Sequence, residues 1–243
     1  MPYAMAIVFM ILSGSLLVGN PVYNYLIYIG FASPFIAAII VVYRFYSIKE
    51  KKSYWTSMVD IRRISWKVLL FIFLFPIGIR WLAALGVGQF VNSGFQFSFS
   101  PEMSLNYTLV LFFLGPLPEE MGWRGVALPA LQKRFGFRIG IIYLGLLWAA
   151  WHLPLFFFQD TYQFQLGLWT PLFWNFMLNA FFTSMILAVL FDTSGNSILA
   201  VILFHYMDNL TGESIVITNS ARIFSTAILG IVAIGLMIFY REK

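Results

Sequence analysis

The residues most able to do chemistry stand together near the middle of the chain, inside a run of apolar residues. Glu119 and Glu120 are adjacent, and Arg124 follows four residues after the second glutamate. A charged side chain at the centre of a bilayer costs about 3 kcal/mol or more, so ionisable residues inside spans usually mark a functional path. The cluster therefore predicts a buried site that uses at least one of its carboxylates.

Helical spacing gives the two glutamates different roles. Residues four apart share one face of a helix, so Glu120 can pair with Arg124. Glu119 points about 100° away from Glu120, because a helix has 3.6 residues per turn. A carboxylate without a cation in a dry cavity suits the role of a general base. We expect Glu119 to be that base; the alternative is that both glutamates only cap a kinked helix.

Both histidines of the protein lie inside apolar stretches. His152 follows Trp148 by four residues, and His205 precedes Asn209 by four. The second pair therefore shares a helix face. An imidazole beside a carboxamide can polarise a carbonyl group or stabilise an oxyanion. We expect His152, His205 and Asn209 to converge on the carboxylates, the alternative being that the histidines are structural.

Taken in order, these motifs resemble those of the CAAX-protease and bacteriocin-processing (CPBP) family of intramembrane proteases, also called the abortive-infection domain. The motifs are Glu119-Glu120-x3-Arg124, Trp148-x3-His152 and His205-x3-Asn209. The family usually has Phe at the first position of the second motif, so Trp148 is a departure that bears on substrate fit. We expect one integral membrane domain, 1–243, with a motif-bearing catalytic core at 105–210.

The resemblance implies an intramembrane endopeptidase that cuts a peptide bond near a substrate's membrane anchor or C-terminus. It implies that Glu119 activates water with the help of His152, and that His205 and Asn209 form the oxyanion hole. The supporting residues are Glu120, Arg124 and Trp148. It also implies a cavity that faces the cytoplasm. The expected partners are membrane lipids and a peptide or protein substrate, lipid-modified or not.

The cofactor requirement is open at this stage. The chain has no Cys, which excludes disulfides and thiolate sites. The zinc signature H-E-x-x-H is absent. Glu119, His152 and His205 could still form a three-ligand zinc site with an open position. We favour a metal-free mechanism, with a zinc-dependent protease at the same site as the alternative.

Two functions of other classes would use the same polar residues. A proton-coupled transporter could use the glutamates and histidines as a relay, but no inverted repeat or pair of broken helices is evident. A noncatalytic immunity or scaffold protein could keep the fold and bind a peptide. Such a scaffold has little reason to keep every costly polar group, so we favour the protease.

The elements that must position these residues are membrane-spanning helices. Of the 243 residues, 60% are hydrophobic and 10% are charged, against about 25% charged in soluble domains. A span needs about 20 apolar residues. The qualifying stretches are 3–18, 22–43, 65–88, 105–131, 137–158, 171–191, 196–210 and 223–240. We predict an all-α polytopic transmembrane helical bundle of about eight spans, with six as the alternative. Pro116 and Pro118 predict a bend just before Glu119.

Basic residues alternate between the loops. Seven of the fifteen Lys and Arg residues lie in 44–67, three more lie in 133–138, and Arg241 and Lys243 end the chain. The loops 89–104 and 159–170 have none. The positive-inside rule therefore predicts that both termini are cytoplasmic. No basic arm with interleaved aromatics is present, so we expect no nucleic-acid partner. The short chain without long extensions favours a prokaryotic plasma-membrane location.

Overall fold

The structure is a computed structural model that describes residues 21–90, 98–99, 104–159 and 161–240. Its α-helices are α2 (Pro21–Phe45), α3 (Ile48–Ser57), α4 (Trp66–Phe90), α5 (Leu105–Leu114), α6 (Pro116–Gly122), α7 (Leu128–Phe135), α8 (Phe137–Trp151), α9 (Tyr162–Leu166), α10 (Pro171–Thr193), α11 (Ile198–Ser214) and α12 (Asn219–Phe239). Shorter elements are η1 (Ile61–Arg63), the π-helical turn η2 (Trp123–Ala127), the 3₁₀ turn η3 (Leu153–Phe157) and the strands β1 (Ser98–Phe99) and β2 (Ile215–Val216).

The prediction of an all-α membrane protein is confirmed. The two short strands pair antiparallel and form the one sheet within the described ranges. Four of the described helices are long and apolar enough to cross a membrane: Trp66–Gln89, Phe137–Phe157, Pro171–Thr193 and Asn219–Phe239. The predicted first span, 3–18, lies outside the described residues, and the count of eight spans and the cytoplasmic termini stay predictions.

The fourth predicted stretch is broken, as its prolines suggested. Helix α5 ends at Gly115, whose φ of −116° and ψ of −97° are not helical, and α6 begins at Pro116. Proline suits the first turn of a helix because it has no N–H to leave unpaired. The stretch then divides further than predicted, because the π-helical turn η2 separates α6 from α7.

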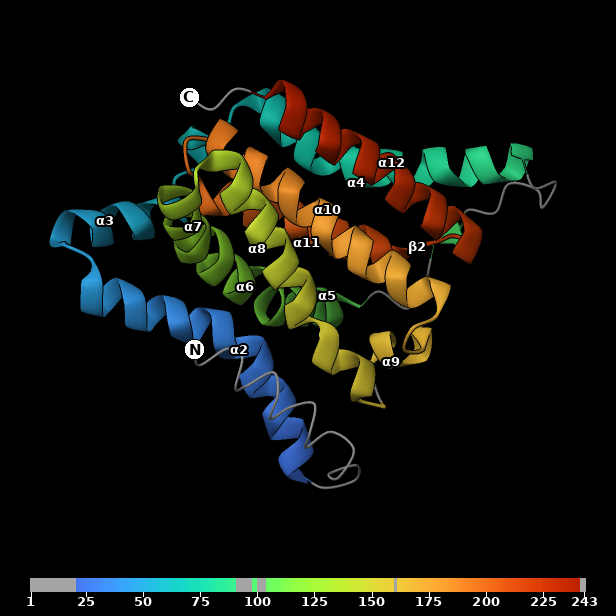
Figure 1. The fold of residues 1–243 in the computed structure, drawn as a ribbon, viewed down its shortest axis with the longest axis horizontal. Helices are drawn as coiled ribbons and strands as arrows, with labels where there is room; N and C mark the ends of the chain where they lie inside the picture. Colours follow the sequence, from blue (N-terminus) through green and yellow to red (C-terminus); the bar gives the residue numbers. More distant parts are fainter. Residues whose placement is uncertain (1–20, 91–97, 100–103, 160, 241–243) are drawn as a thin grey trace.

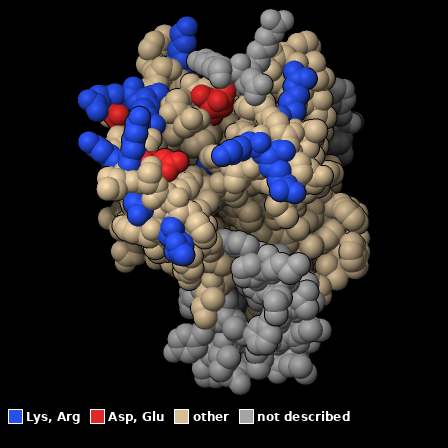
Figure 2. Space-filling model, turned by 60° about the vertical axis from the view of Figure 1, so that its left-hand side comes forward, with Lys and Arg blue, Asp and Glu red and all other residues tan. Residues whose placement is uncertain are grey.

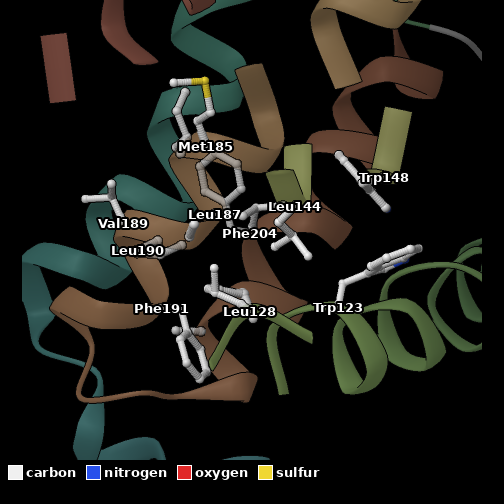
Figure 3. Packing of buried hydrophobic residues seen from close by; sticks show 14 of the residues in the cluster. Trp123, Leu128, Leu144, Trp148, Met185, Leu187, Val189, Leu190, Phe191 and Phe204 are labelled. Carbon is white, nitrogen blue, oxygen red and sulfur yellow. The ribbon is translucent and has the colours of Figure 1, made fainter. Parts of the chain in front are cut away.

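Helix α10 is central to the bundle and packs against α8 and α12 (Figure 1). Helix α4 packs against α11 and α12, and α2 packs against α6. Buried apolar side chains from these helices form one large core, part of which Figure 3 shows. The elements that carry the three motifs, α6, α8 and α11, all contribute to this core.

The two ends of the bundle differ in charge. One end holds α3, α7, the start of α8 and the end of α12, where Arg63 donates to the Gly195 carbonyl at 3.1 Å and Arg138 to the Ile238 carbonyl at 3.2 Å. We name this the basic end; Figure 2 turns it toward the viewer and shows Lys and Arg gathered on it. The opposite end, with α9 and the β1–β2 pair, is named the strand end (Figure 1).

Two polar contacts join helices inside the bundle. Arg80 of α4 donates to Asp208 Oδ1 on α11 at 2.9 Å and forms a partly buried ion pair with it. Asn179 of α10 donates to Thr226 Oγ1 on α12 at 3.2 Å, which makes it an interhelical hydrogen bond.

Candidate active site

Glu119 lies in the first turn of α6, directly after the break at Gly115. Its side chain is buried, with 6% of its surface exposed. The indole N–H of Trp148, on α8, donates a hydrogen bond to Glu119 Oε2 at 2.8 Å. Because one carboxylate oxygen is held in this way, Oε1 is the atom left for a ligand.

Glu120 contacts Arg124, as its spacing predicts, and it also contacts His205, which its spacing does not predict. Arg124 Nη1 donates to Glu120 Oε1 at 2.8 Å, and both side chains are fully buried. The second guanidinium nitrogen, Nη2, donates to Ser184 Oγ at 2.9 Å on α10. His205 Nδ1 lies 2.8 Å from the same Glu120 Oε1. Glu120 thus ties η2, α10 and α11 together around its carboxylate.

The partners of the two histidines fix which ring nitrogens are free. His205 Nδ1 faces a carboxylate oxygen and His152 Nδ1 lies 2.8 Å from the Trp148 carbonyl. Both oxygens are acceptors, so both Nδ1 atoms carry hydrogen. In each ring Nε2 is then available to a ligand, as an acceptor in the neutral form and as a donor in the cation.

Aromatic rings hold His152 in place. Its ring lies edge-on to Trp148 at 5.1 Å, to Trp151 at 5.0 Å and to Phe176 at 5.4 Å between centroids. Helix α8 ends at this point, and the 3₁₀ turn η3 follows with Pro154 in its first turn. His152 is therefore fixed at the end of α8 by packing as well as by its hydrogen bond.

All four residues predicted to act in catalysis line one cavity of about 650 Å³. They are Glu119, His152, His205 and Asn209. Asn209 also lies against the break before α6, since a Cβ on Gly115 would stand 3.6 Å from Asn209 Nδ2. The volume is in the range of small-molecule and cofactor sites. The expected convergence of the three motifs is thus present, while the role of each residue remains a proposal.

The sequence did not reveal how many residues of the site Trp148 contacts. Besides its bond to Glu119, its ring lies edge-on to both histidines, and the Arg124 guanidinium stands 4.7 Å from its centroid. The motif spacing placed Trp148 near His152, but a contact across 29 residues to Glu119 has no signature in the sequence. The departure from Phe at this position therefore adds a hydrogen-bond donor to the site.

The zinc alternative has no ligand cluster in the described part of the chain. Among residues 21–90, 98–99, 104–159 and 161–240, no three His, Asp or Glu side chains are placed to share a metal ion. Nδ1 of His205 is bonded to Glu120, and Nδ1 of His152 is bonded to a backbone carbonyl. The set Glu119, His152 and His205 thus lines one cavity without forming a ready three-ligand site.

Comparison with known proteins finds similarity to one family over the range that carries these residues. Residues 101–211 match the family described as Type II CAAX prenyl endopeptidase Rce1-like, and this range encloses all three motifs. Over this range the chain is similar to the CAAX-protease (CPBP) family. A CAAX-family relative, CAAX prenyl protease 2 of Methanococcus maripaludis, is 29% identical over 220 residues, which cover 88% of this chain and 80% of the relative.

The cavity reaches the strand end of the bundle. Its lining includes Tyr162 and Gln163 of α9, Ile217 after β2 and Arg222 of α12. The cavity lining contains no residue of the basic end as defined above. From the sequence we expect both the cavity and the basic loops to face the cytoplasm. The structure places them at opposite ends of the molecule, so the two expectations cannot both hold.

Proposed function

We propose that this protein is an intramembrane endopeptidase in which Glu119 activates a water molecule. The observation that carries the proposal is the convergence of Glu119, His152, His205 and Asn209 on one cavity. The family match and the name of the archaeal relative support a CAAX-type endopeptidase. In this proposal the protein acts in a prokaryotic plasma membrane and cuts a peptide bond beside a substrate's membrane anchor or C-terminus.

The first step is attack of water on the scissile carbonyl carbon. Glu119 Oε1 takes a proton from the water, and the water oxygen forms a bond to the carbon. His152 Nε2 accepts the second water hydrogen, because Nδ1–H of the same ring is bonded to the Trp148 carbonyl. Two contacts on one water would fix its direction of attack.

The carbonyl oxygen becomes negative in this step and needs donors. Asn209 supplies its carboxamide N–H, and His205 supplies Nε2–H from a ring that carries both protons. Glu120, bonded to His205 Nδ1 at 2.8 Å, balances the charge of that ring. Donors fixed before the reaction stabilise a tetrahedral oxyanion without reorganising. The C–N bond then breaks, and the amine leaves with the proton that Glu119 had taken.

The test is a comparison of new N-termini in membranes that contain the wild-type protein or Glu119→Gln. We expect a set of N-termini, each next to a hydrophobic or lipid-modified segment, that is present only with the wild type. Equal sets of N-termini in both membranes, at matched protein levels, would exclude the proposal. Proton-coupled flux in proteoliposomes that survives loss of cleavage would point to the transporter alternative instead.

A further inference from the structure

The cavity is closed toward the basic end by a layer of fully buried side chains. Leu144, Leu187 and Val201 each have 0% of their surface exposed. Each lies one helical turn closer to the basic end than a cavity-lining residue of its own helix. The lining residues are Trp148 on α8, Thr183 on α10 and His205 on α11.

This layer belongs to the main core and is contributed by several helices. Figure 3 shows Leu144 and Leu187 among its members, together with Leu128 of α7. Protein cores are packed about as densely as organic crystals, with few voids larger than a water molecule. A peptide therefore cannot reach Glu119 from the basic end without unpacking the core, whereas the strand end is joined to the site by the cavity.

The charge of the two ends gives the direction of the cavity in the membrane. Cytoplasmic loops carry an excess of Lys and Arg, counted near the ends of the spans. The basic end has Arg44, Lys49, Lys51, Lys52, Arg62, Arg63, Lys67, Lys133, Arg134 and Arg138. In contrast, no Lys or Arg occurs in 81–123 or in 139–221, the two stretches that contain the loops of the strand end.

Arg222 is the basic residue of the strand end in the described part of the chain, and it is held within the protein. Its Nη1 donates to the Tyr162 hydroxyl at 2.6 Å, and its guanidinium lies 5.8 Å from the centre of that ring. Among the described residues, the strand end has one cationic side chain, against ten at the basic end. The basic end is thus assigned to the cytoplasm.

We infer that the cavity opens to the extracytoplasmic side of the membrane and is closed toward the cytoplasm. Its substrates are then peptides or proteins whose cut bond is presented from the extracytoplasmic side. A prenylated C-terminus on the cytoplasmic face would not reach Glu119. The statement about substrates rests on the proposed function, whereas the direction of the cavity does not.

Single-cysteine variants test the direction without background, because the chain has no Cys. Gln163→Cys reports the mouth of the cavity, and Lys52→Cys, at an exposed position of α3, reports the basic end. In intact expressing cells, a membrane-impermeant maleimide should label Gln163→Cys at least tenfold more than Lys52→Cys. The order should reverse in inverted membrane vesicles. Stronger labelling of Lys52→Cys in sealed intact cells, or equal labelling of both, would overturn the inference.

A second pair of variants tests whether the cavity itself is reached from outside. Asn175→Cys places a thiol on the cavity lining, and Val201→Cys places one in the buried layer. A small impermeant thiosulfonate should modify Asn175→Cys from the outside of intact cells and leave Val201→Cys unmodified from either side. Modification of Asn175→Cys only in inverted vesicles would show that the cavity opens to the cytoplasm.

The labelling experiment is independent of catalysis. Repeating it with Glu119→Gln in the background should give the same pattern, since orientation does not depend on the base. If that variant still cleaves while the pattern holds, the proposed mechanism fails and the direction of the cavity stands. If cleavage is lost but the pattern is reversed, the mechanism stands and the direction is wrong.

Discussion

At the scale of single residues, the site is organised by contacts that join distant parts of the chain. The i, i+4 spacing was enough to predict the pair of Glu120 and Arg124, because helix geometry alone brings them together. The contacts of His205 with Glu120 and of Trp148 with Glu119 span 85 and 29 residues. These contacts depend on how α8 and α11 pack against α6, which spacing within one motif does not contain.

The indole of Trp148 yields a prediction that separates its hydrogen bond from its bulk. Trp148→Phe keeps an aromatic ring and removes the donor to Glu119. A hydrogen bond to a charged group contributes about 1.5–3 kcal/mol, so kcat should fall by about tenfold or more with KM nearly unchanged. Steady-state kinetics on a peptide substrate measures both.

The matched control is Trp151→Phe. Trp151 also stands edge-on to His152, at 5.0 Å, but its N–H donates to Ser33 Oγ at 3.3 Å and not to a carboxylate. Its effect on kcat should be clearly smaller. Equal losses in the two variants would mean that ring shape, not the hydrogen bond to Glu119, explains the role of Trp148.

Arg124 gives a stability prediction. Its guanidinium is fully buried and bonded to Glu120 and Ser184. Removing one partner of a buried ion pair costs about 3–5 kcal/mol, because the other charge is left uncompensated. Arg124→Met should therefore lower Tm in detergent strongly, whereas Arg134→Met, at an exposed position of α7, should leave Tm almost unchanged. A small shift for Arg124→Met would contradict this account of the pair.

The metal-free mechanism predicts that chelators do not change the cleavage rate. Dialysis against EDTA and 1,10-phenanthroline should leave the cleavage rate of the purified protein within about twofold, because every step is assigned to side chains. The measurement is the initial rate before and after dialysis, with metal content determined in parallel. Loss of activity that zinc restores would favour the three-ligand alternative of Glu119, His152 and His205.

At the scale of elements, apolar length and proline position predicted the helices and the bend before Glu119. They did not predict the π-helical turn η2, because its backbone is shaped by tertiary contacts. Next to this turn, the buried Tyr54 hydroxyl of α3 donates to the Met121 carbonyl at 3.0 Å, a bond across 67 residues. π-Helical turns occur often at functional sites, and here the turn carries Arg124.

Gly122 lets α2 approach the motif helix closely. A Cβ at this position would lie 2.5 Å from the Pro34 carbonyl oxygen, a backbone atom that cannot move alone. Overpacking typically costs about 1–3 kcal/mol, so Gly122→Ala should lower Tm in detergent. Gly78→Ala is the control, since a Cβ at Gly78 of α4 would meet no atom within 4 Å. Equal Tm values for the two variants would show that the close approach of α2 is not required.

At the scale of the whole molecule, the packed layer and the cavity divide the bundle into a closed half and an open half. The sequence predicted the convergence of three motifs through their order and their polar residues. It did not reveal where the cavity opens, because that depends on which side chains at each helical level are buried. The charge pattern indicates which end faces the cytoplasm, and the packing shows which end is closed. The side from which a substrate enters follows only from the two together.

The central claim is that Glu119 is the base that activates water. The most direct measurement is the cleavage rate of purified Glu119→Gln, which keeps the shape of the side chain, beside Glu213→Gln, which changes a glutamate elsewhere on the cavity lining. General-base catalysis contributes about 10²–10⁴-fold. We predict a loss of that size for Glu119→Gln at unchanged Tm, and a near wild-type rate for Glu213→Gln. A wild-type rate in folded Glu119→Gln would contradict the account.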